Sequence, residues 1–344
     1  MSLQLATSKS AQAAYGLVKK LQSRLVQSLD ELPPPSKSSR FQPINWLRAQ
    51  GVHGGGTRYV AVDEALFNRA SVNISQVQYE SDPSKKMGSS SALSTIVHPR
   101  HPFAPSMHMH ISWTELKSGE GYWRIMGDLN PSTPQAPDTQ AFDKALQEVC
   151  GALYQKGKDQ GEQYFFIPAL GRHRGVAHFY LEDYRSANLQ ADFDFAEAFG
   201  LKVIQSYAAI VKQNLLEARP VVAADWQRQL HYHSLYFLQV LTLDRGTTSG
   251  LLVHDENDTG ILGSLPSHVD KALLSSWLPK LPKLQQTLLK MIIDTLPQGE
   301  TSLVDDGVKV KIAQVSREFY RLHPETQDLL AQGFTIPPTQ ENHR

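Results

Sequence analysis

Residues 108–115, His-Met-His-Ile-Ser-Trp-Thr-Glu, alternate along their length and predict the strand around which the fold is built. One face of this strand would carry the polar side chains His108, His110, Ser112 and Thr114. The other face would be mostly apolar, with Met109, Ile111, Trp113 and Glu115. Because side chains two apart in a strand point the same way, both histidines are expected on one surface of a sheet.

The sequence on either side of this strand predicts more strands. Extended segments are expected at 58–62, 72–79, 92–97, 122–129, 164–168, 176–180, 237–243 and 260–265. Residues 117–121 contain two glycines and predict a hairpin turn between two of these strands. Asp128 follows Gly127 and precedes Asn130-Pro131, so we expect it at the mouth of a turn.

Helical spacing of apolar residues predicts helices at 9–31, 139–156, 191–217, 226–236, 271–293 and 314–331. The strands do not alternate regularly with helices, which argues against a doubly wound parallel sheet. We therefore expect an α+β fold in which helices cover one large antiparallel sheet. Residues 1–44 would form an N-terminal helix and linker, and residues 271–344 a C-terminal helical extension packed on the main domain, 45–270.

Composition excludes several classes of protein. The chain has 344 residues and equal numbers of basic and acidic side chains, 34 of each, which argues against a nucleic-acid-binding protein. Cys150 is the only cysteine, so no internal disulfide forms, and a reducing, cytoplasmic location is expected. Cys150 itself lies on an apolar helix face and is expected in the core. No run approaches the ~18 apolar residues that a transmembrane helix needs.

Cation-capable side chains are concentrated in one short segment. His98, Arg100, His101, His108 and His110 fall within thirteen positions. Three prolines in the same segment fix their own φ angles and restrain the preceding residues. A segment with this composition is suited to hold polar groups at fixed positions.

The residues alone leave several chemistries open. His108 and His110 could chelate a metal ion, with His98 or Asp128 as third ligand, or could serve in hydrogen bonding and proton transfer. Arginine binds carboxylates bidentately, so an acidic ligand is a second candidate. The arginines at strand or turn junctions that would serve it are Arg100, Arg174 and Arg245.

Five motifs in collinear order resemble the oxygen-dependent coproporphyrinogen III oxidase family. Residues 98–108 are similar to its His-Pro-[Arg/Lys]-Asn-Pro-x-x-Pro-Thr-x-His signature, and 127–131 to its Asp-Leu-Thr-Pro segment. Residues 164–183 resemble its Phe-Phe and Arg-Gly block. The motifs Asp-Arg-Gly-Thr at 244–247 and Ser-Leu-Pro at 264–266 match its last two signatures. The resemblance covers roughly residues 45–270.

This resemblance implies a large flat antiparallel sheet between two layers of helices, and a homodimer. It implies that two propionates of coproporphyrinogen III are oxidatively decarboxylated to vinyl groups by dioxygen, without a metal or organic cofactor. Asp128 would bind the pyrrole N–H groups, Arg174 a propionate, and His108 would donate or accept a proton. Further contacts with this anionic tetrapyrrole are expected from Ser94, His98, Arg100, His110, Ser112 and Arg245.

Several positions depart from the family pattern. His110 stands where the family has Asn, and Ser112 where it has Arg, which removes a partner for a propionate. Residues 123–127, Trp-Arg-Ile-Met-Gly, stand where the family has Trp-Phe-Gly-Gly-Gly, so bulky side chains replace glycines, and Arg124 is a candidate to supply the missing cation. Three hypotheses follow: an active oxidase, a homologue that binds or converts another tetrapyrrole, and a non-catalytic interaction protein. In the first, Asp128→Ala is expected to abolish turnover while leaving the fold intact.

Overall fold

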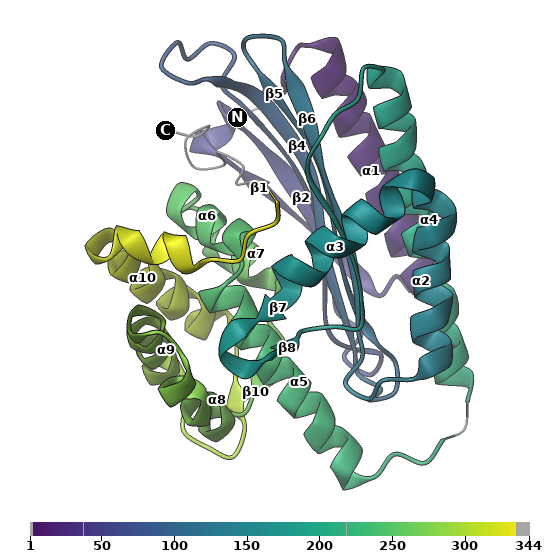
Figure 1. Ribbon diagram of the computed structural model, residues 1–344, viewed down its shortest axis with the longest axis vertical. Coiled ribbons are helices and arrows are strands. Elements are labelled where there is room, and N and C mark those ends of the chain that lie inside the picture. The colour runs from purple at the N-terminus through teal and green to yellow at the C-terminus, as the bar shows by residue number, and fades with distance from the viewer. Residues whose placement is uncertain (1–2, 37, 218, 335–344) are drawn as a thin grey trace.

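The computed structural model describes residues 3–36, 38–217 and 219–334 and has an α+β fold. Seven antiparallel strands form one large sheet in the order β1-β2-β3-β4-β5-β6-β9, with helices on both faces (Figure 1). The strands are β1 (Phe41–Leu47), β2 (Gly54–Ala61), β3 (Phe67–Gln78), β4 (Met87–Pro99), β5 (Ser106–Leu116), β6 (Gly121–Asn130) and β9 (Ala177–Tyr184). The expected fold class is therefore confirmed.

The alternation that predicted the central strand appears in β5 as two different faces. Met109 and Ile111 are fully buried in the main hydrophobic core, whereas His108 and His110 are partly exposed on the opposite face. The apolar face is covered by α1 (Lys9–Asp30), α2 (Ala136–Cys150) and α4 (Leu189–Leu216). Cys150 lies at the end of α2 in this core, as expected, and burial raises the pKa of its thiol to about 12.

The other face of the sheet is partly covered by a second group of helices with its own hydrophobic core. It contains α5 (Ala223–Thr242), α6 (Arg245–Val253), α7 (Asp258–Ile261), α8 (Lys271–Trp277), α9 (Lys283–Thr295) and α10 (Asp306–Leu322). Figure 1 shows α8, α9 and α10 gathered beside α5, and the buried side chains of these four helices belong to one cluster. The boundary predicted at residue 270 stays a prediction, and residues 335–344 of the predicted extension lie outside the described residues.

Two predicted strands are wrong, because residues 237–243 and 260–265 are mostly helical. The apolar run 237–243 lies at the end of α5 and just beyond it, where nearly every side chain is buried. Short apolar runs of this kind fit a buried strand and a buried helix equally well. Residues 260–265 lie at the end of α7 and in the 3-10 turn Leu262–Ser264 that follows it.

The segment after α2 also differs from expectation. The helix predicted at 139–156 is interrupted at Gly151, whose φ of 49° is left-handed, and a new helix, α3 (Tyr154–Phe165), follows. The strand predicted at 164–168 shrinks to β7 (Phe166–Ile167), which pairs with β8 (Arg172–His173). The remaining small pair is β10 (His268–Val269) with β11 (Ser302–Leu303). In the described ranges, no helix has both the length and the apolar character needed to cross a membrane.

Candidate functional site

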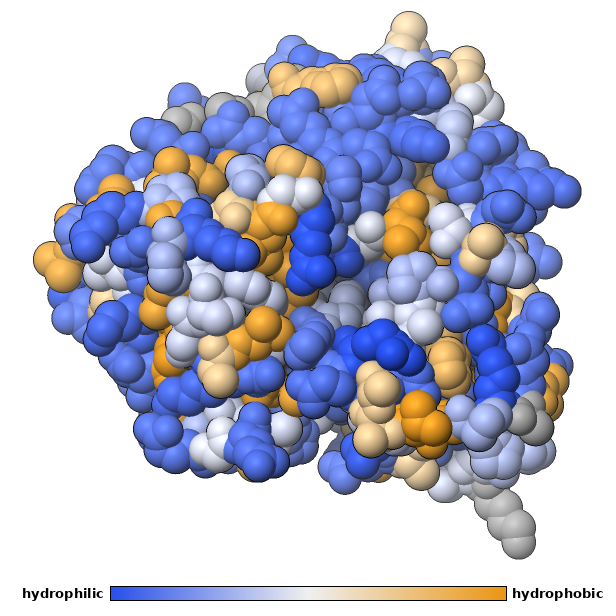
Figure 2. Space-filling model, turned by 60° about the horizontal axis from the view of Figure 1, so that its bottom comes forward, coloured by the Kyte–Doolittle hydropathy of each residue, from blue (hydrophilic) through white to orange (hydrophobic). Residues whose placement is uncertain are grey.

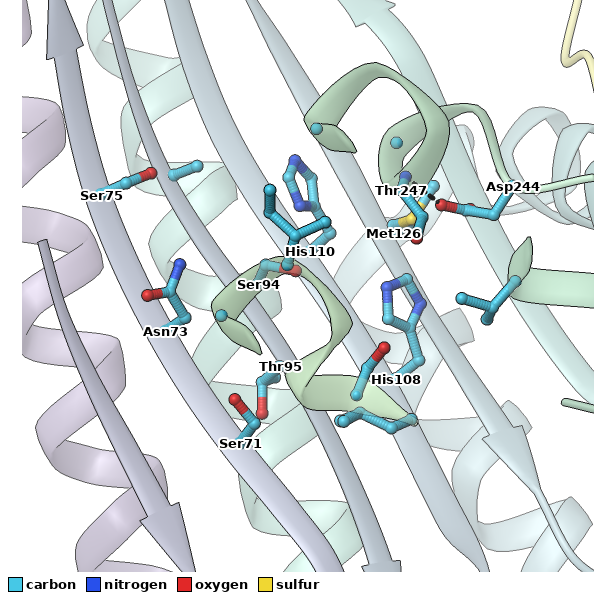
Figure 3. A pocket seen from close by; sticks show the side chains of 18 of the residues that line it. Ser71, Asn73, Ser75, Ser94, Thr95, His108, His110, Met126, Asp244 and Thr247 are labelled. Atoms are coloured by element: carbon cyan, nitrogen blue, oxygen red, sulfur yellow. Dashed lines mark hydrogen bonds between the residues drawn. The ribbon is translucent and has the colours of Figure 1, made fainter. Parts of the chain in front are cut away.

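A cavity of about 250 Å³ lies between the polar face of the sheet and the helices that cover it. Side chains of β3, β4, β5 and β6 form its floor, and Figure 3 shows His108 and His110 of β5 beside Ser94 of β4. Its roof is built from the start of α6 and the segment from Asn257 to Ser264, with α5 closing one side. The face that the sequence predicted to be polar therefore lines a cavity.

The floor consists of rows of side chains that cross the strands in register. Residues opposite one another in an antiparallel sheet point to the same face, so each row is a continuous strip. The central row is Asn73, Ser94, His110 and Met126. On one side lies the row Ser71, Ile96, His108 and Asp128, and on the other the row Ser75, Ala92, Ser112 and Arg124.

Asp128 forms the centre of a buried polar cluster. Its Oδ1 accepts a hydrogen bond from His108 Nδ1 at 2.8 Å, and its Oδ2 accepts one from Arg174 Nη2 at 2.6 Å. Asn130 Nδ2 also donates to Oδ2. Burial by itself raises the pKa of the Asp128 carboxyl, but Arg174 and His108 outweigh it and hold this pKa below its usual range.

Asp128 lies inside the strand predicted at 122–129, two residues before the end of β6, and not at the mouth of a turn. Asp128 lies within β6, directly opposite His108 in β5 and His178 in β9, and its side chain is inaccessible to solvent. The residues of this cluster that line the cavity are His108 and Arg174, with Asp128 behind them. A carboxylate in this position orients its two neighbours and keeps a compensating negative charge beside the guanidinium.

All three nitrogens of the Arg174 guanidinium donate hydrogen bonds, and two aromatic rings lie close to it. Nη1 donates to Gln239 Oε1 at 2.6 Å, and Nε donates to Asn130 Oδ1 at 3.3 Å. The guanidinium carbon lies 4.5 Å from the ring centre of Phe165 and 5.0 Å from that of Tyr236. Burial opposes the charged form, but the Asp128 carboxylate outweighs burial and raises the pKa of Arg174. Arg174 is therefore a fixed cation beside the cavity.

The hydrogen bond to Asp128 sets the tautomer of His108. Its Nδ1 must carry the proton that Asp128 accepts, so in the neutral ring Nε2 is left as a proton acceptor. His110, two residues along, bonds through Nε2 to Ser112 Oγ at 3.0 Å. Burial, followed by Arg124 and His108, lowers the pKa of His110 well below its ordinary value, so this ring stays neutral.

His98 is separate from this pair of histidines. It is fully buried, with Nδ1 bonded to Ser106 Oγ at 2.8 Å and Nε2 to the Ser264 carbonyl at 3.2 Å, and it does not line the cavity. Among the described residues, no group of three or more His, Cys, Asp or Glu side chains could hold a metal ion. His98 therefore does not join His108 and His110 as the third metal ligand considered from the sequence.

The other predicted ligand contacts are distributed unevenly. Ser94 lies on the cavity floor, and Ser112 lines an adjoining hollow of about 160 Å³. Asp244 and Gly246 line the cavity on either side of Arg245, whose Nε and Nη2 atoms are buried without a hydrogen-bond partner among the described residues. Arg100 is exposed beyond the end of β4 and lies outside the cavity.

Two further residues belong to the site: Arg124, which the sequence offered only as a candidate to supply the missing cation, and Gln239, which it did not indicate. Arg124 lines both hollows, donates from Nε to Tyr180 Oη at 2.9 Å, and lies 3.8 Å from Glu182. The strand pattern supports that candidate, because residue 124 lies on the same face of β6 as residues 126 and 128. No local pattern identifies Gln239, which lies inside an apolar run.

The fold and the Asp–Arg–His cluster define an α+β protein with a cavity suited to an acidic organic ligand. A family model described as coproporphyrinogen III oxidase matches residues 14–283, most of the chain. The chain therefore belongs to the coproporphyrinogen III oxidase family, and the resemblance found in its motifs is confirmed. The matched region includes the whole sheet and the cavity floor.

Similar curated proteins carry the same family name. An oxygen-dependent coproporphyrinogen-III oxidase of Rickettsia akari is 30% identical over 247 residues, which cover 68% of this chain and 86% of the relative. The mitochondrial oxygen-dependent enzyme of Homo sapiens is 28% identical over 280 residues, 73% of this chain and 59% of the relative. That of Rattus norvegicus is 29% identical, over 66% of this chain and 56% of the relative. The chain thus spans little more than half the length of its mammalian relatives and is a divergent member.

Proposed function

We propose that this chain catalyses the oxidative decarboxylation of coproporphyrinogen III propionates to vinyl groups, with dioxygen as co-substrate. The observation that carries the proposal is the placement of His108 and Arg174 side by side at the cavity, with the ionised Asp128 bonded to both. A fixed guanidinium suits a carboxylate arm, and a neighbouring imidazole suits proton transfer from that arm. Membership of the family supports the choice of substrate.

The overall change balances without a further oxidant. Each propionate arm loses carbon dioxide and two hydrogens, and dioxygen takes up the hydrogens to leave as hydrogen peroxide. In this scheme Arg174 binds the carboxylate, His108 Nε2 accepts a proton, and Asp128 positions both residues. The direct contact between Asp128 and pyrrole N–H groups that the resemblance implies would require His108 to swing aside.

The size of the cavity bears on how a whole tetrapyrrole would enter. Its volume of about 250 Å³ is just below the roughly 300–1,000 Å³ of typical small-molecule pockets. In this proposal the roof segment, from Asn257 to Ser264, shifts away from the sheet to admit a macrocycle with four acidic arms. Arg317 of α10 fixes one end of this segment through a bidentate ion pair with Asp258, both contacts at 2.6 Å.

The proposal includes the remaining expectations from the sequence. It requires no metal or organic cofactor, and it places the protein in the cytoplasm as a homodimer. Figure 2 shows a mainly hydrophilic surface broken by small groups of hydrophobic residues, so this face does not indicate where a second copy would bind. Oligomeric state and location are therefore predictions, to be tested by sedimentation and by fractionation of cells.

The decisive experiment starts from protein loaded with coproporphyrinogen III under anaerobic conditions. After oxygen is added, mass analysis should show the loss of two molecules of carbon dioxide and four hydrogens. His108→Gln should lower the rate by about 10²- to 10⁴-fold, while His101→Gln, outside the cavity, should leave it unchanged. Wild-type protein that binds the substrate but releases no carbon dioxide would exclude the oxidase and favour a divergent tetrapyrrole-binding homologue. A protein that binds no tetrapyrrole would favour the interaction protein.

A further inference from the structure

Arg58 is a buried cation at one end of the central floor row. It lies on β2 directly opposite Asn73 of β3, so its side chain shares the face that carries Ser94 and His110. Only 7% of the residue is exposed, and its Nε and Nη1 atoms have no hydrogen-bond partner within the described part of the chain. Buried guanidinium N–H groups without acceptors are costly, and this cost calls for an explanation.

The surroundings of Arg58 carry more positive than negative charge, because three cations face only two carboxylates, Asp306 and, beside Arg69, Glu64. Arg69 and Lys309 lie close enough to the same carboxylate, Asp306, to interact with it electrostatically, as Arg58 does. Asp306 forms its ion pair with Lys309, at 2.9 Å, and its side chain is 75% exposed. Burial therefore outweighs the attraction to Asp306 and lowers the pKa of Arg58. By contrast, Arg174 at the reacting centre is already compensated by Asp128.

The Arg58 guanidinium lies directly against the cavity roof. A Cβ placed on Gly260 would be 2.3 Å from Arg58 Nη1, and one placed on Gly263 would be 3.7 Å from Arg58 Cδ. Gly260 lines the cavity, as do Ser71 and Asn73 on the neighbouring strand. Arg58 itself does not line the cavity, and the roof shift of the proposed function would uncover its guanidinium beside these two uncharged polar side chains.

We propose that Arg58 is the anchor of a second carboxylate subsite, which binds an acidic arm of the ligand that does not react. The identity of the ligand rests on the proposed function. His108 lies three strands away from Arg58 and one row aside, so their separation exceeds the roughly 14 Å that three strand spacings of ~4.8 Å give. A carboxylate held by Arg58 is thus too far from His108 to react, so the subsite fixes the orientation of the ligand.

The test compares the acid and ester forms of a stable probe. Coproporphyrin III and its tetramethyl ester are titrated against the full-length protein by fluorescence. Arg58→Met should weaken binding of the acid roughly 10- to 100-fold, and binding of the ester should not change. Arg58→Lys, which keeps the charge without the forked donors, should recover part of the lost affinity. Lys290→Met is the control: it removes a cation outside the cavity that already has a carboxylate partner, Asp294, and should change the affinity by less than about 3-fold.

Two results of the binding titrations would overturn the subsite. One is wild-type affinity of Arg58→Met for the acid; the other is an equal loss of acid and ester binding in both Arg58 variants, which would indicate a structural role. A second measurement, turnover of coproporphyrinogen III by the wild-type protein, tests the proposed oxidase function independently of the Arg58 subsite. If the wild type turns over and Arg58→Met keeps its KM, the subsite alone is wrong. If the acid binds through Arg58 but no carbon dioxide is released, the oxidase proposal alone is wrong.

Discussion

The two faces of the central sheet are built from the same strands but differ in the polarity and burial of their side chains. On the face covered by α1, α2 and α4, residues such as Leu93 and Ile111 are fully buried in a continuous hydrophobic core. One residue further along each strand, Ser94 and Ser112 lie on the floor of the cavity and its adjoining hollow. The comparison shows that the face under α1, α2 and α4 is apolar along these strands, whereas the face under the second group of helices also carries the polar groups that line the cavity.

The charged groups on or behind the polar face are of two kinds. Some have a partner of opposite charge within hydrogen-bond distance, and others do not. Around Asp128, every charged group has a partner of opposite sign within hydrogen-bond distance. Around Arg58, two guanidinium nitrogens have no acceptor in the described structure. The balanced charges around Asp128 hold Arg174 in a fixed position beside the cavity, whereas Arg58, among the described residues, still has guanidinium N–H groups free for a further anion.

The largest expected effect concerns the compensated centre. Asp128→Ala should lower the free energy of unfolding by about 3–5 kcal/mol, because it leaves the Arg174 guanidinium buried without its partner. It should also abolish turnover. Urea unfolding of the wild type and of Asp128→Ala measures the change in the free energy of unfolding. The sequence-based expectation that this variant keeps its fold intact is thereby revised, since it assumed a turn aspartate.

A matched aspartate makes that test specific. Asp294 forms an exposed i,i+4 pair with Lys290, with 64% of its side chain accessible. Asp294→Ala should change stability by less than about 0.5 kcal/mol. Equal effects of the two substitutions would contradict the view that Asp128 compensates a buried charge.

The contrast between the faces predicts a large loss of stability at one residue of β4 and almost none at the next. Leu93→Ala should lower the free energy of unfolding by about 2–5 kcal/mol, because it opens a cavity in a packed core. Ser94→Ala should change it by about 0.5 kcal/mol or less, since the serine is exposed on the cavity floor. Denaturant midpoints of both variants measure this contrast, and similar losses would show that the two faces contribute equally to stability.

A smaller effect, on the pH dependence of stability, is expected from His233 of α5, which is buried behind the polar face. Burial, followed by repulsion from His268, lowers the pKa of His233 to about 3, compared with about 6.5 in an unfolded chain. The unfolded chain therefore takes up a proton below pH 6.5 that the folded chain does not bind until near pH 3. The stability that the neutral ring contributes is present above pH 6.5 and is lost as the pH falls towards 3.

His233→Phe should remove this part of the acid sensitivity. Relative to wild type, the variant should gain about 2 kcal/mol of stability between pH 7.5 and pH 5. Urea unfolding at both pH values measures this difference. An unchanged difference between the two proteins across this range would show that His233 does not titrate as its burial implies.

Sequence reasoning succeeded where the pattern is local. The alternation in β5, the helix at the N-terminus and the burial of Cys150 each depend on residues a few positions apart. It failed at 237–243, where helix α5 is surrounded by other apolar helices, so that no polar face remains to reveal the helical period. It also misplaced Asp128, because a Gly and an Asn-Pro next to it are typical of a turn.

The sequence by itself determined the α+β class, the polar and apolar faces of the sheet, and the family, because strand periodicity and short motifs are written in neighbouring residues. Only the tertiary structure decided how the charges are distributed. Arg174 reaches Asp128 across 46 positions and Gln239 across 65, and Arg58 meets Gly260 from a distant part of the chain. Whether a charge is compensated depends on which distant groups surround it after folding, and no local pattern records that.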